Sequence, residues 1–403
     1  MFKRMLISIG GVSFALSLVM ALASLSSILL ARALTPSQFG EFSLMRTLVL
    51  FLPPIAAWGQ DVATARFFSR NDPERYRWRQ VHSLILKIGS VLTIIGVLLC
   101  AHLYRLSLPK LIGLAVASLA YVSTLFFSNL WRSRKSYAPA MLMVNGFRGA
   151  FFFYVLVLFI THRATAATAI WGYFGVIVLI ALFNVAYTYR RIPQGEQPIP
   201  RSFYTSGLLL LGSQTSVTLL GSLDSLFIPK MLDLASLGLY QAATAPAQLF
   251  NIIGRAAKYV WVPEFGSRNR VEMKRLTIGL ALVSGVLLIL AMATAQPLLH
   301  LLYKGKYDHG ANLLRILFAA GAVRLYYHLS SSVIIGRLEQ AALSLHLGLT
   351  VVMVFVEAGL LFVLLRAFGV IGAAWASLIV GLLRALFSYG IVWKYRSQLA
   401  FKP

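Results

Sequence analysis

Charged side chains inside long apolar runs are the residues of this sequence that could do chemistry. The runs contain the basic residues Arg46, Arg148, Arg255, Lys258, Arg324 and Arg384, and the acidic residues Asp61, Asp224 and Glu357. If the runs cross a bilayer, each charge at mid-depth costs roughly 2.5–3.5 kcal/mol on insertion scales. Such residues should therefore face a wet cavity or one another, and their summed charge is positive.

A net-positive interior suits an anionic ligand that is rich in oxygen atoms. A guanidinium group stays charged and can donate two parallel hydrogen bonds to a planar pair of oxygens, which fits a pyrophosphate or an acidic sugar. We therefore predict that the six basic residues contact such a substrate. The alternative is a structural role, in which Asp61 or Glu357 neutralises a neighbouring arginine.

The three acidic residues are candidates for coupling transport to a proton or Na+ gradient. A carboxylate at bilayer depth can take up and release a proton during a transport cycle. The alternative is again a structural pair with a neighbouring arginine. We expect no cofactor other than such a coupling ion.

No pattern typical of catalysis or metal binding occurs in the chain. There is no paired-carboxylate or nucleophile constellation and no Cys/His metal spacing. The single cysteine, Cys100, lies in an apolar run and cannot form an internal disulfide. We expect no catalytic residue and no metal site.

The elements that must position these charges are membrane-spanning helices. Of the 403 residues 59% are hydrophobic and only 12% are charged, and the mean hydropathy is +0.77, whereas soluble domains carry about 25% charged residues. Runs long enough to cross about 30 Å of hydrocarbon predict an all-α polytopic membrane protein of about twelve spans, at residues 8–31, 41–67, 81–103, 109–131, 138–160, 166–188, 203–229, 236–263, 276–302, 310–335, 341–365 and 370–393.

The loop charges predict how the spans are oriented. If the N-terminus is cytoplasmic, most loop Lys and Arg residues lie on the cytoplasmic side, as the positive-inside rule requires. This distribution accounts for the net charge of +25 through contacts with membrane lipids and without a nucleic-acid partner. We therefore expect a multi-pass protein of the bacterial inner membrane with both termini in the cytoplasm.

The two halves of the chain resemble each other at an offset of 198 residues. Segment 34–42 (LTPSQFGEF) aligns with 232–240 (LDLASLGLY), and without a gap 67–71 (FFSRN) aligns with 265–269 (FGSRN). Since each half holds an even number of spans, both halves enter the membrane in the same direction. We predict two six-helix lobes, 1–192 and 203–403, with a cytoplasmic linker at 193–202 and a pseudo-twofold axis along the membrane normal.

The repeated segments also carry a family resemblance. Residues 32–43 (RALTPSQFGEFS) and the echo at 237–243 (LGLYQAA) resemble the first outer loop of polysaccharide flippases of the Wzx type. These flippases belong to the multidrug/oligosaccharidyl-lipid/polysaccharide exporter superfamily. About twelve spans resembles these flippases more than the lipid II flippases, which usually have two more.

The resemblance implies a function and partners. It implies transfer of an undecaprenyl-pyrophosphate-linked oligosaccharide, the repeat unit of a polysaccharide, from the cytoplasmic to the periplasmic leaflet. Alternating access of the two lobes to a shared cleft is the mechanism that follows. The family also implies work beside a polysaccharide polymerase and a chain-length regulator.

Two other functions fit the sequence less well. A cation-coupled multidrug exporter of the same superfamily carries many cationic substrates, which the net-positive interior disfavours. A membrane polymerase or ligase needs a sizeable outer loop for its catalytic site, whereas the longest outer loop here is the short stretch at 303–310. The sequence therefore favours a transporter over an enzyme.

Overall fold

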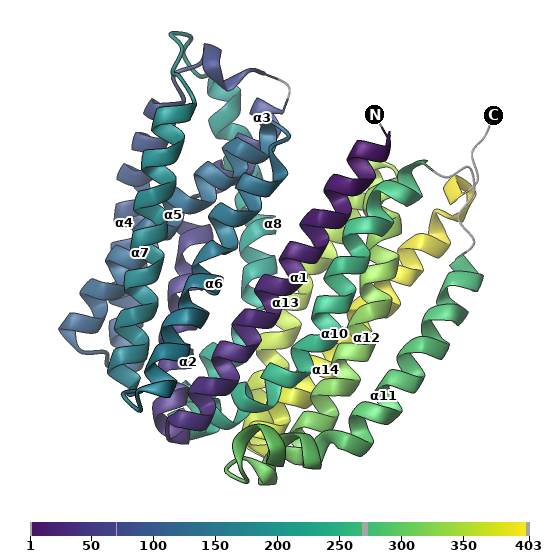
Figure 1. The fold of residues 1–403 in the computed structure, drawn as a ribbon. Coiled ribbons are helices and arrows are strands. Elements are labelled where there is room, and N and C mark those ends of the chain that lie inside the picture. Colours follow the sequence, from purple (N-terminus) through teal and green to yellow (C-terminus); the bar gives the residue numbers. More distant parts are fainter. Residues whose placement is uncertain (1, 70, 268–272, 400–403) are drawn as a thin grey trace. The chain divides into compact units, whose positions relative to one another are not determined.

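The computed structural model describes residues 2–69, 71–267 and 273–399, and they are almost entirely helical (Figure 1). Three short 3-10 helices lie at Pro73–Arg75, Asp308–Gly310 and Arg396–Leu399. The α-helices of the described residues are α1 (Phe2–Ala33), α2 (Pro36–Ala56), α3 (Gln60–Phe68), α4 (Trp78–Tyr104), α5 (Leu108–Ser133), α6 (Tyr137–Ile160), α7 (Ala166–Arg191), α8 (Arg201–Leu220), α9 (Leu223–Met231), α10 (Leu234–Ser267), α11 (Met273–Tyr303), α12 (Ala311–Arg337), α13 (Gln340–Phe368) and α14 (Val370–Lys394).

Every predicted apolar run is mostly helical, so the all-α prediction is confirmed. Within the described residues, eight helices are long and apolar enough by themselves to cross a membrane: α2, α4, α5, α6, α7, α11, α13 and α14. Two predicted runs are each split into two helices. Residues 41–67 form parts of α2 and α3, and residues 203–229 form parts of α8 and α9.

The break between α2 and α3 has a local cause. Pro53 and Pro54 lie within the last turn of α2, where proline removes a backbone donor. Trp58 and Gly59 then adopt left-handed conformations, with φ of 41° and 77°. The break is packed against α8, because Gln60 Nε2 donates a 3.0 Å hydrogen bond to the carbonyl oxygen of Tyr204.

Contacts divide the chain into two compact units. The first unit comprises Met1–Gly40 and Met231–Pro403, and the second comprises Glu41–Lys230. The first therefore holds α1, the first turn of α2 and α10–α14, and the second holds the rest of α2 through α9. This grouping differs from the two lobes derived from the sequence repeat, since α1 packs on α10, and α8 on α3. The division into the lobes 1–192 and 203–403 therefore stays a prediction, which rests on the sequence repeat alone.

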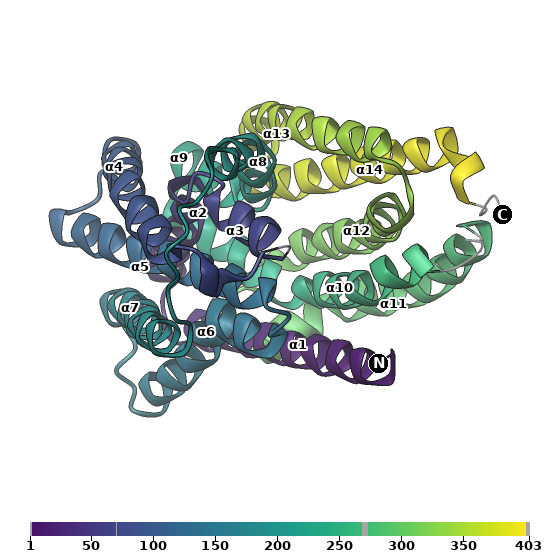
Figure 2. The same cartoon turned by 90° about the horizontal axis from the view of Figure 1, so that it is seen from above.

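Each unit is built around one central helix. In the second unit α5 packs against α3, α4, α6 and α7. In the first unit α12 packs against α10, α11 and α14, and Figure 2 shows it between α10 and α14. Because α5 and α12 are the fourth predicted span of each half, the repeat seen in the sequence is also a repeat of helix packing.

The predicted linker is part of the second unit. Trp78 Nε1 donates to the carbonyl oxygen of Pro193 at 3.1 Å. The backbone N–H of Arg77 donates to the carbonyl of Gln197 at 2.9 Å, and that of Gln197 donates to Arg75 at 3.0 Å. These bonds tie the segment 193–197 to the loop that precedes α4.

The first turns of α2 and α10, which carry the sequence repeat, contact each other. A Cβ atom on Gly40 would lie 1.7 Å from the carbonyl oxygen of Leu234, and one on Gly238 would lie 2.0 Å from that of Pro36. The contact is reciprocal, because Leu234 aligns with Pro36 and Gly238 with Gly40 at the offset of 198. We call this contact the first-turn crossing.

Both turns of the crossing are capped by side chains. Gln38 N donates to Thr35 Oγ1 at 3.3 Å, and Thr35 N donates back to Gln38 Oε1 at 3.2 Å, which is a capping box. At the start of α10, Ser236 N donates to Asp233 Oδ1 at 2.6 Å. The repeated motif is therefore a helix cap followed five residues later by a glycine that permits backbone contact.

Candidate functional site

The predicted basic residues divide between the two units. Arg46 on α2 and Arg148 on α6 belong to the second unit, whereas Lys258, Arg324 and Arg384 belong to the first. The backbone of Arg255 is part of α10, but its side chain lies outside the described residues. Its predicted role therefore stays a prediction.

In the second unit, Arg46 and Arg148 lie on a shared set of aromatic rings. The Arg46 guanidinium lies 5.7 Å from the centre of the Phe42 ring, and that of Arg148 lies 5.4 Å from the Phe147 ring. The two arginines are close enough to repel each other electrostatically. Tyr173 joins the rings, since its centroid is 5.8 Å from both Phe42 and Phe147.

Helical spacing explains this arginine–aromatic cluster, which comprises Phe42, Arg46, Phe147, Arg148 and Tyr173. Residues four apart share a helix face, which puts Phe42 and Arg46 side by side on α2. Arg148 is oriented by a 2.8 Å hydrogen bond to Asn145 Oδ1, one turn earlier on α6. The three rings of the cluster are buried, and a ring holds a guanidinium without neutralising its charge, so the arginine can still bind anionic oxygens.

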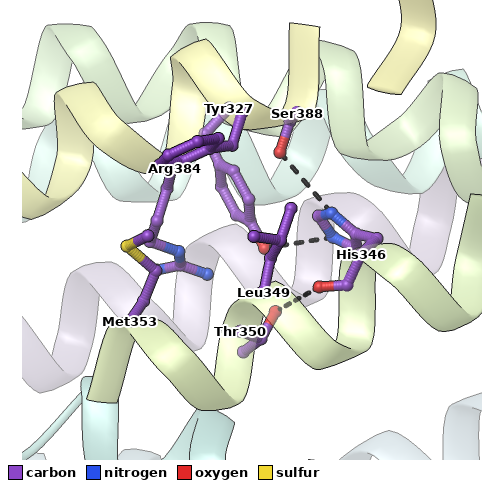
Figure 3. Close-up of a pocket in the computed structure, with 8 residues that line it drawn as sticks. Tyr327, His346, Leu349, Thr350, Met353, Arg384 and Ser388 are labelled. Carbon is purple, nitrogen blue, oxygen red and sulfur yellow. Dashed lines mark hydrogen bonds between the residues drawn. The ribbon is translucent and has the colours of Figure 1, made fainter. Parts of the chain in front are cut away.

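In the first unit, Arg384 on α14 lies over an aromatic ring beside a small pocket (Figure 3). Its guanidinium is 4.0 Å from the centre of the Tyr327 ring. Its Nε atom is buried and makes no hydrogen bond with the described residues. The lining side chains come from α12, α13 and α14, and they are Tyr327, His346, Leu349, Thr350, Met353, Arg384, Phe387 and Ser388.

His346 connects the polar side chains of this pocket. Its Nε2 is 3.5 Å from the Tyr327 hydroxyl, and its Nδ1 is 3.5 Å from Ser388 Oγ (Figure 3). Lys258 on α10 donates to Ser331 Oγ at 3.2 Å and lies within electrostatic range of Arg384 and His346. The pocket lining contains no carboxylate, so its only charged or titratable side chains besides Tyr327 are Arg384 and His346.

Arg324 makes a different contact from the one expected of a substrate ligand. Its terminal nitrogen donates a 2.5 Å hydrogen bond to Ser377 Oγ, which joins α12 to α14. Arg324 does not line the pocket described above. Its predicted substrate contact stays a prediction.

The three acidic residues lie on α3, α9 and α13. Asp61 follows the break before α3, is 2% exposed, and its Oδ1 accepts no hydrogen bond from the described part of the chain. Asp224 on α9 accepts a 2.8 Å bond from the backbone N–H of Ser225. Glu357 is buried on α13. No group of three or more potential metal ligands occurs among the described residues.

The sequence does not reveal the uncharged partners in the arginine–aromatic cluster or in the pocket beside Arg384. Phe42, Phe147 and Tyr173 look like ordinary membrane aromatics in the sequence. His346 carried a usable signal, because a histidine within an apolar run is unusual at bilayer depth. Which of these residues meet depends on helix rotation, and the sequence does not contain that information directly.

Comparison with known proteins assigns the family. The profile described as polysaccharide biosynthesis protein matches residues 9–269. The chain belongs to this family. No curated protein matches the chain significantly in sequence.

Several solved structures share the fold of this chain. An inward-facing multidrug-resistance MATE family transporter of the MOP superfamily is 14% identical, with a TM-score of 0.64 over 95% of this chain and 96% of the other. The inward closed form of the lipid II flippase MurJ is 12% identical, with a TM-score of 0.66 over 97% and 87%. A point mutant of the Vibrio cholerae MATE transporter VcmN is 14% identical, with a TM-score of 0.60 over 97% and 98%.

Family and fold can therefore be stated together. The chain belongs to the polysaccharide biosynthesis family and shares its fold with MATE family transporters and with the lipid II flippase MurJ. The predicted family and all-α fold class are thereby confirmed.

Proposed function

We propose that this protein flips an undecaprenyl-pyrophosphate-linked oligosaccharide from the cytoplasmic to the periplasmic leaflet of the bacterial inner membrane. The observation that carries the proposal is the arginine–aromatic cluster of the second unit, in which Arg46 and Arg148 share one set of rings. Family membership and the fold likeness to a lipid II flippase support a lipid-linked glycan as cargo. The termini lie in the cytoplasm, and a polymerase and a chain-length regulator receive the product.

In the proposed mechanism, each part of the cargo meets a matching chemistry. Arg46 and Arg148 bind the pyrophosphate oxygens, and the buried rings of Phe42 and Phe147 hold their guanidinium groups in place. Lys258, Arg384 and the predicted residues Arg255 and Arg324 bind further anionic groups, while the polyprenyl tail stays in lipid. Alternating access then exposes the sugar head to the periplasm.

The same cluster disfavours export of cationic drugs. A cationic drug in contact with Arg46 and Arg148 would bring three positive charges together, and like charges within a few ångströms repel strongly where water is scarce. An acidic cavity would be the favourable arrangement for such a substrate. The multidrug alternative therefore predicts a negatively charged binding site, whereas this cluster is positively charged.

For energy coupling, we propose Asp61, Asp224 and Glu357 as the candidates for a proton or Na+ site. Asp61 is the strongest of the three, because it is buried beside a helix break and its Oδ1 lacks a hydrogen bond within the described residues. An Asp61→Asn variant should bind cargo but lose its response to an imposed ion gradient in proteoliposomes. A gradient response equal to that of the wild type would exclude Asp61.

The site is tested by replacing its charges one at a time. Arg46→Gln and Arg148→Gln remove the charge but keep a polar side chain of similar length. In a flippase-null strain that makes the cognate lipid-linked glycan, we expect each variant to reduce glycan export about tenfold or more at unchanged protein level, because each lost charge removes a charge-assisted hydrogen bond of roughly 1.5–3 kcal/mol.

A matched control is available on α12. Arg315 also donates to an asparagine three residues earlier on its own helix, with 2.8 Å between its Nη1 and Asn312 Oδ1. It lies at the predicted outer end of α12, outside the arginine–aromatic cluster and the pocket beside Arg384. The Arg315→Gln variant should therefore export the glycan normally. Full export by both cluster variants would overturn the site, and failure of the wild type to move any lipid-linked glycan would overturn the function.

A further inference from the structure

We propose that the C-terminal ends of α5 and α7 form a binding site for the headgroup phosphate of an anionic phospholipid. All of its residues belong to the second unit, in which α5 and α7 pack side by side (Figure 2). The site shares no residue with the arginine–aromatic cluster, and it does not depend on which cargo the protein carries. We call it the phospholipid site, and it comprises Trp131, Arg134, Phe183, Tyr187 and Arg191.

A row of side chains on α7 changes from apolar to cationic along the helix. Leu179, Phe183, Tyr187 and Arg191 follow at four-residue intervals, so each neighbours the next on the helix surface. The first two are 66% and 63% exposed, and Arg191 is also exposed. Since α7 is long and apolar enough to cross a membrane, its exposed apolar residues are suited to contact lipid chains.

The length of this row matches one leaflet of a bilayer. At 1.5 Å per residue, Leu179 and Arg191 are separated by about 18 Å along the helix axis. Half of the hydrocarbon core is roughly 15 Å thick. With Arg191 at the headgroups, Leu179 therefore lies near the middle of the bilayer. In the predicted topology the leaflet is the cytoplasmic one, and the row faces the chain, the interface and the phosphate of one lipid.

Aromatic rings from two helices support Arg191. Its guanidinium lies 5.8 Å from the centre of the Tyr187 ring. That ring stacks on Phe183 at 5.9 Å and lies 5.3 Å from the ring of Trp131 on α5. Trp131 is itself fixed to α7, because its Nε1 donates a 3.0 Å hydrogen bond to Thr188 Oγ1. The cation is therefore placed over a supported ring at the membrane surface.

The charges of the site favour an anionic lipid. Arg134 lies over Trp131 at 5.8 Å and forms a 2.8 Å ion pair with Glu74. Arg191 forms no ion pair with the described part of the chain, so its guanidinium can donate two parallel hydrogen bonds to a phosphate. A zwitterionic lipid would bring its own cation toward the arginines, and like charges repel.

The neighbouring Arg190 separates a built site from a merely basic surface. It is exposed and lies with Arg191 in the last turn of α7, where both charges favour the helix dipole and an anionic membrane surface. Of the two, only Arg191 lies over an aromatic ring among the described residues. Surface charge alone therefore predicts equal contributions to lipid binding, whereas the phospholipid site predicts a larger one from Arg191.

The first experiment compares these two arginines. The purified full-length protein in detergent is titrated with phosphatidylglycerol, and bound lipid molecules are counted by native mass spectrometry. We expect Arg191→Gln to weaken the tightest phosphatidylglycerol binding severalfold, because the supported cation is lost. Arg190→Gln, the matched control, should bind nearly as the wild type does. Equal losses in the two variants, or no loss in Arg191→Gln, would overturn the site.

The second experiment tests the ring beneath Arg191. Tyr187→Leu removes the ring and should weaken phosphatidylglycerol binding, whereas Tyr187→Phe keeps the ring and should restore it. Circular dichroism and size-exclusion chromatography confirm that both proteins are folded. Wild-type affinity in folded Tyr187→Leu would overturn the role of the ring. If that variant does not fold, the comparison of the exposed Arg190 and Arg191 still decides whether the site exists.

The choice of lipid tests the class of ligand. Phosphatidylcholine carries the same phosphate with an added cation and should bind more weakly than phosphatidylglycerol, so equal binding would overturn the preference for an anionic lipid. Undecaprenyl phosphate presents a phosphate on the lipid carrier of the proposed cargo. If it displaces phosphatidylglycerol from the wild type but not from Arg191→Gln, the site binds the carrier and the phospholipid assignment is wrong. None of these measurements requires transport, so a failure of glycan export would leave the phospholipid site standing.

Discussion

At the scale of single residues, several basic side chains of this protein are supported by aromatic rings. Arg384 illustrates this, since its guanidinium lies against Tyr327 at 4.0 Å while its Nε makes no hydrogen bond with the described residues. A desolvated cation over a ring gains about 2 kcal/mol. The ring thus holds the cation beside the pocket and leaves its charge in place, whereas a carboxylate would neutralise it.

Two substitutions of Tyr327 separate stacking from hydrogen bonding. Tyr327→Leu removes the ring beneath Arg384 and should weaken the stabilisation of the purified protein by inorganic pyrophosphate, measured as a shift in melting temperature in nanodiscs. Tyr327→Phe keeps the ring and removes only the hydroxyl near His346, so it should retain most of that shift. Equal shifts in the two variants would show that stacking does not position Arg384.

At the scale of elements, hydropathy predicts the helices but not their breaks. The run at 41–67 is continuously apolar enough to be predicted as one span. The structure instead ends α2 at Ala56 and begins α3 at Gln60. The deciding features are the left-handed Trp58 and Gly59 and the packing of α8 against them. A local sequence pattern cannot predict a break that depends on a helix more than a hundred residues away.

The break should be sensitive to one added methyl group. Gly59 has φ of 77°, and a Cβ there would lie 2.0 Å from the carbonyl oxygen of Gly207. Gly59→Ala should therefore lower stability by at least the roughly 1–2 kcal/mol that a left-handed conformation costs an L-residue. Gly146→Ala on α6 meets no atom within 4 Å and should be neutral or slightly stabilising. Thermal unfolding in detergent compares the two, and similar melting temperatures would mean that α8 yields at this contact.

At the scale of the whole molecule, the charges that could bind cargo were visible in the sequence, but their grouping was not. Arg46 and Arg148 are about a hundred residues apart, and only the packing of α2, α6 and α7 brings them to the same rings. Arg324 looked equivalent to them and instead bonds to Ser377. The repeat predicted equivalent halves, whereas contacts place α1 with the helices of the second half.

The place of the linker leads to a prediction about the intact molecule. A lobe-to-lobe joint at 193–202 would be the only covalent link between two six-helix bundles, and cutting it would let them part in mild detergent. Here the linker is bonded to the loop before α4 and lies inside the second unit, whose connections to the first are at 40–41 and 230–231. A protease site that replaces residues 194–196 should therefore leave both fragments together on size-exclusion chromatography after cleavage, with transport retained. Separation of the fragments would show instead that the packing of α8 and α9 with the second unit is too weak to hold the molecule together.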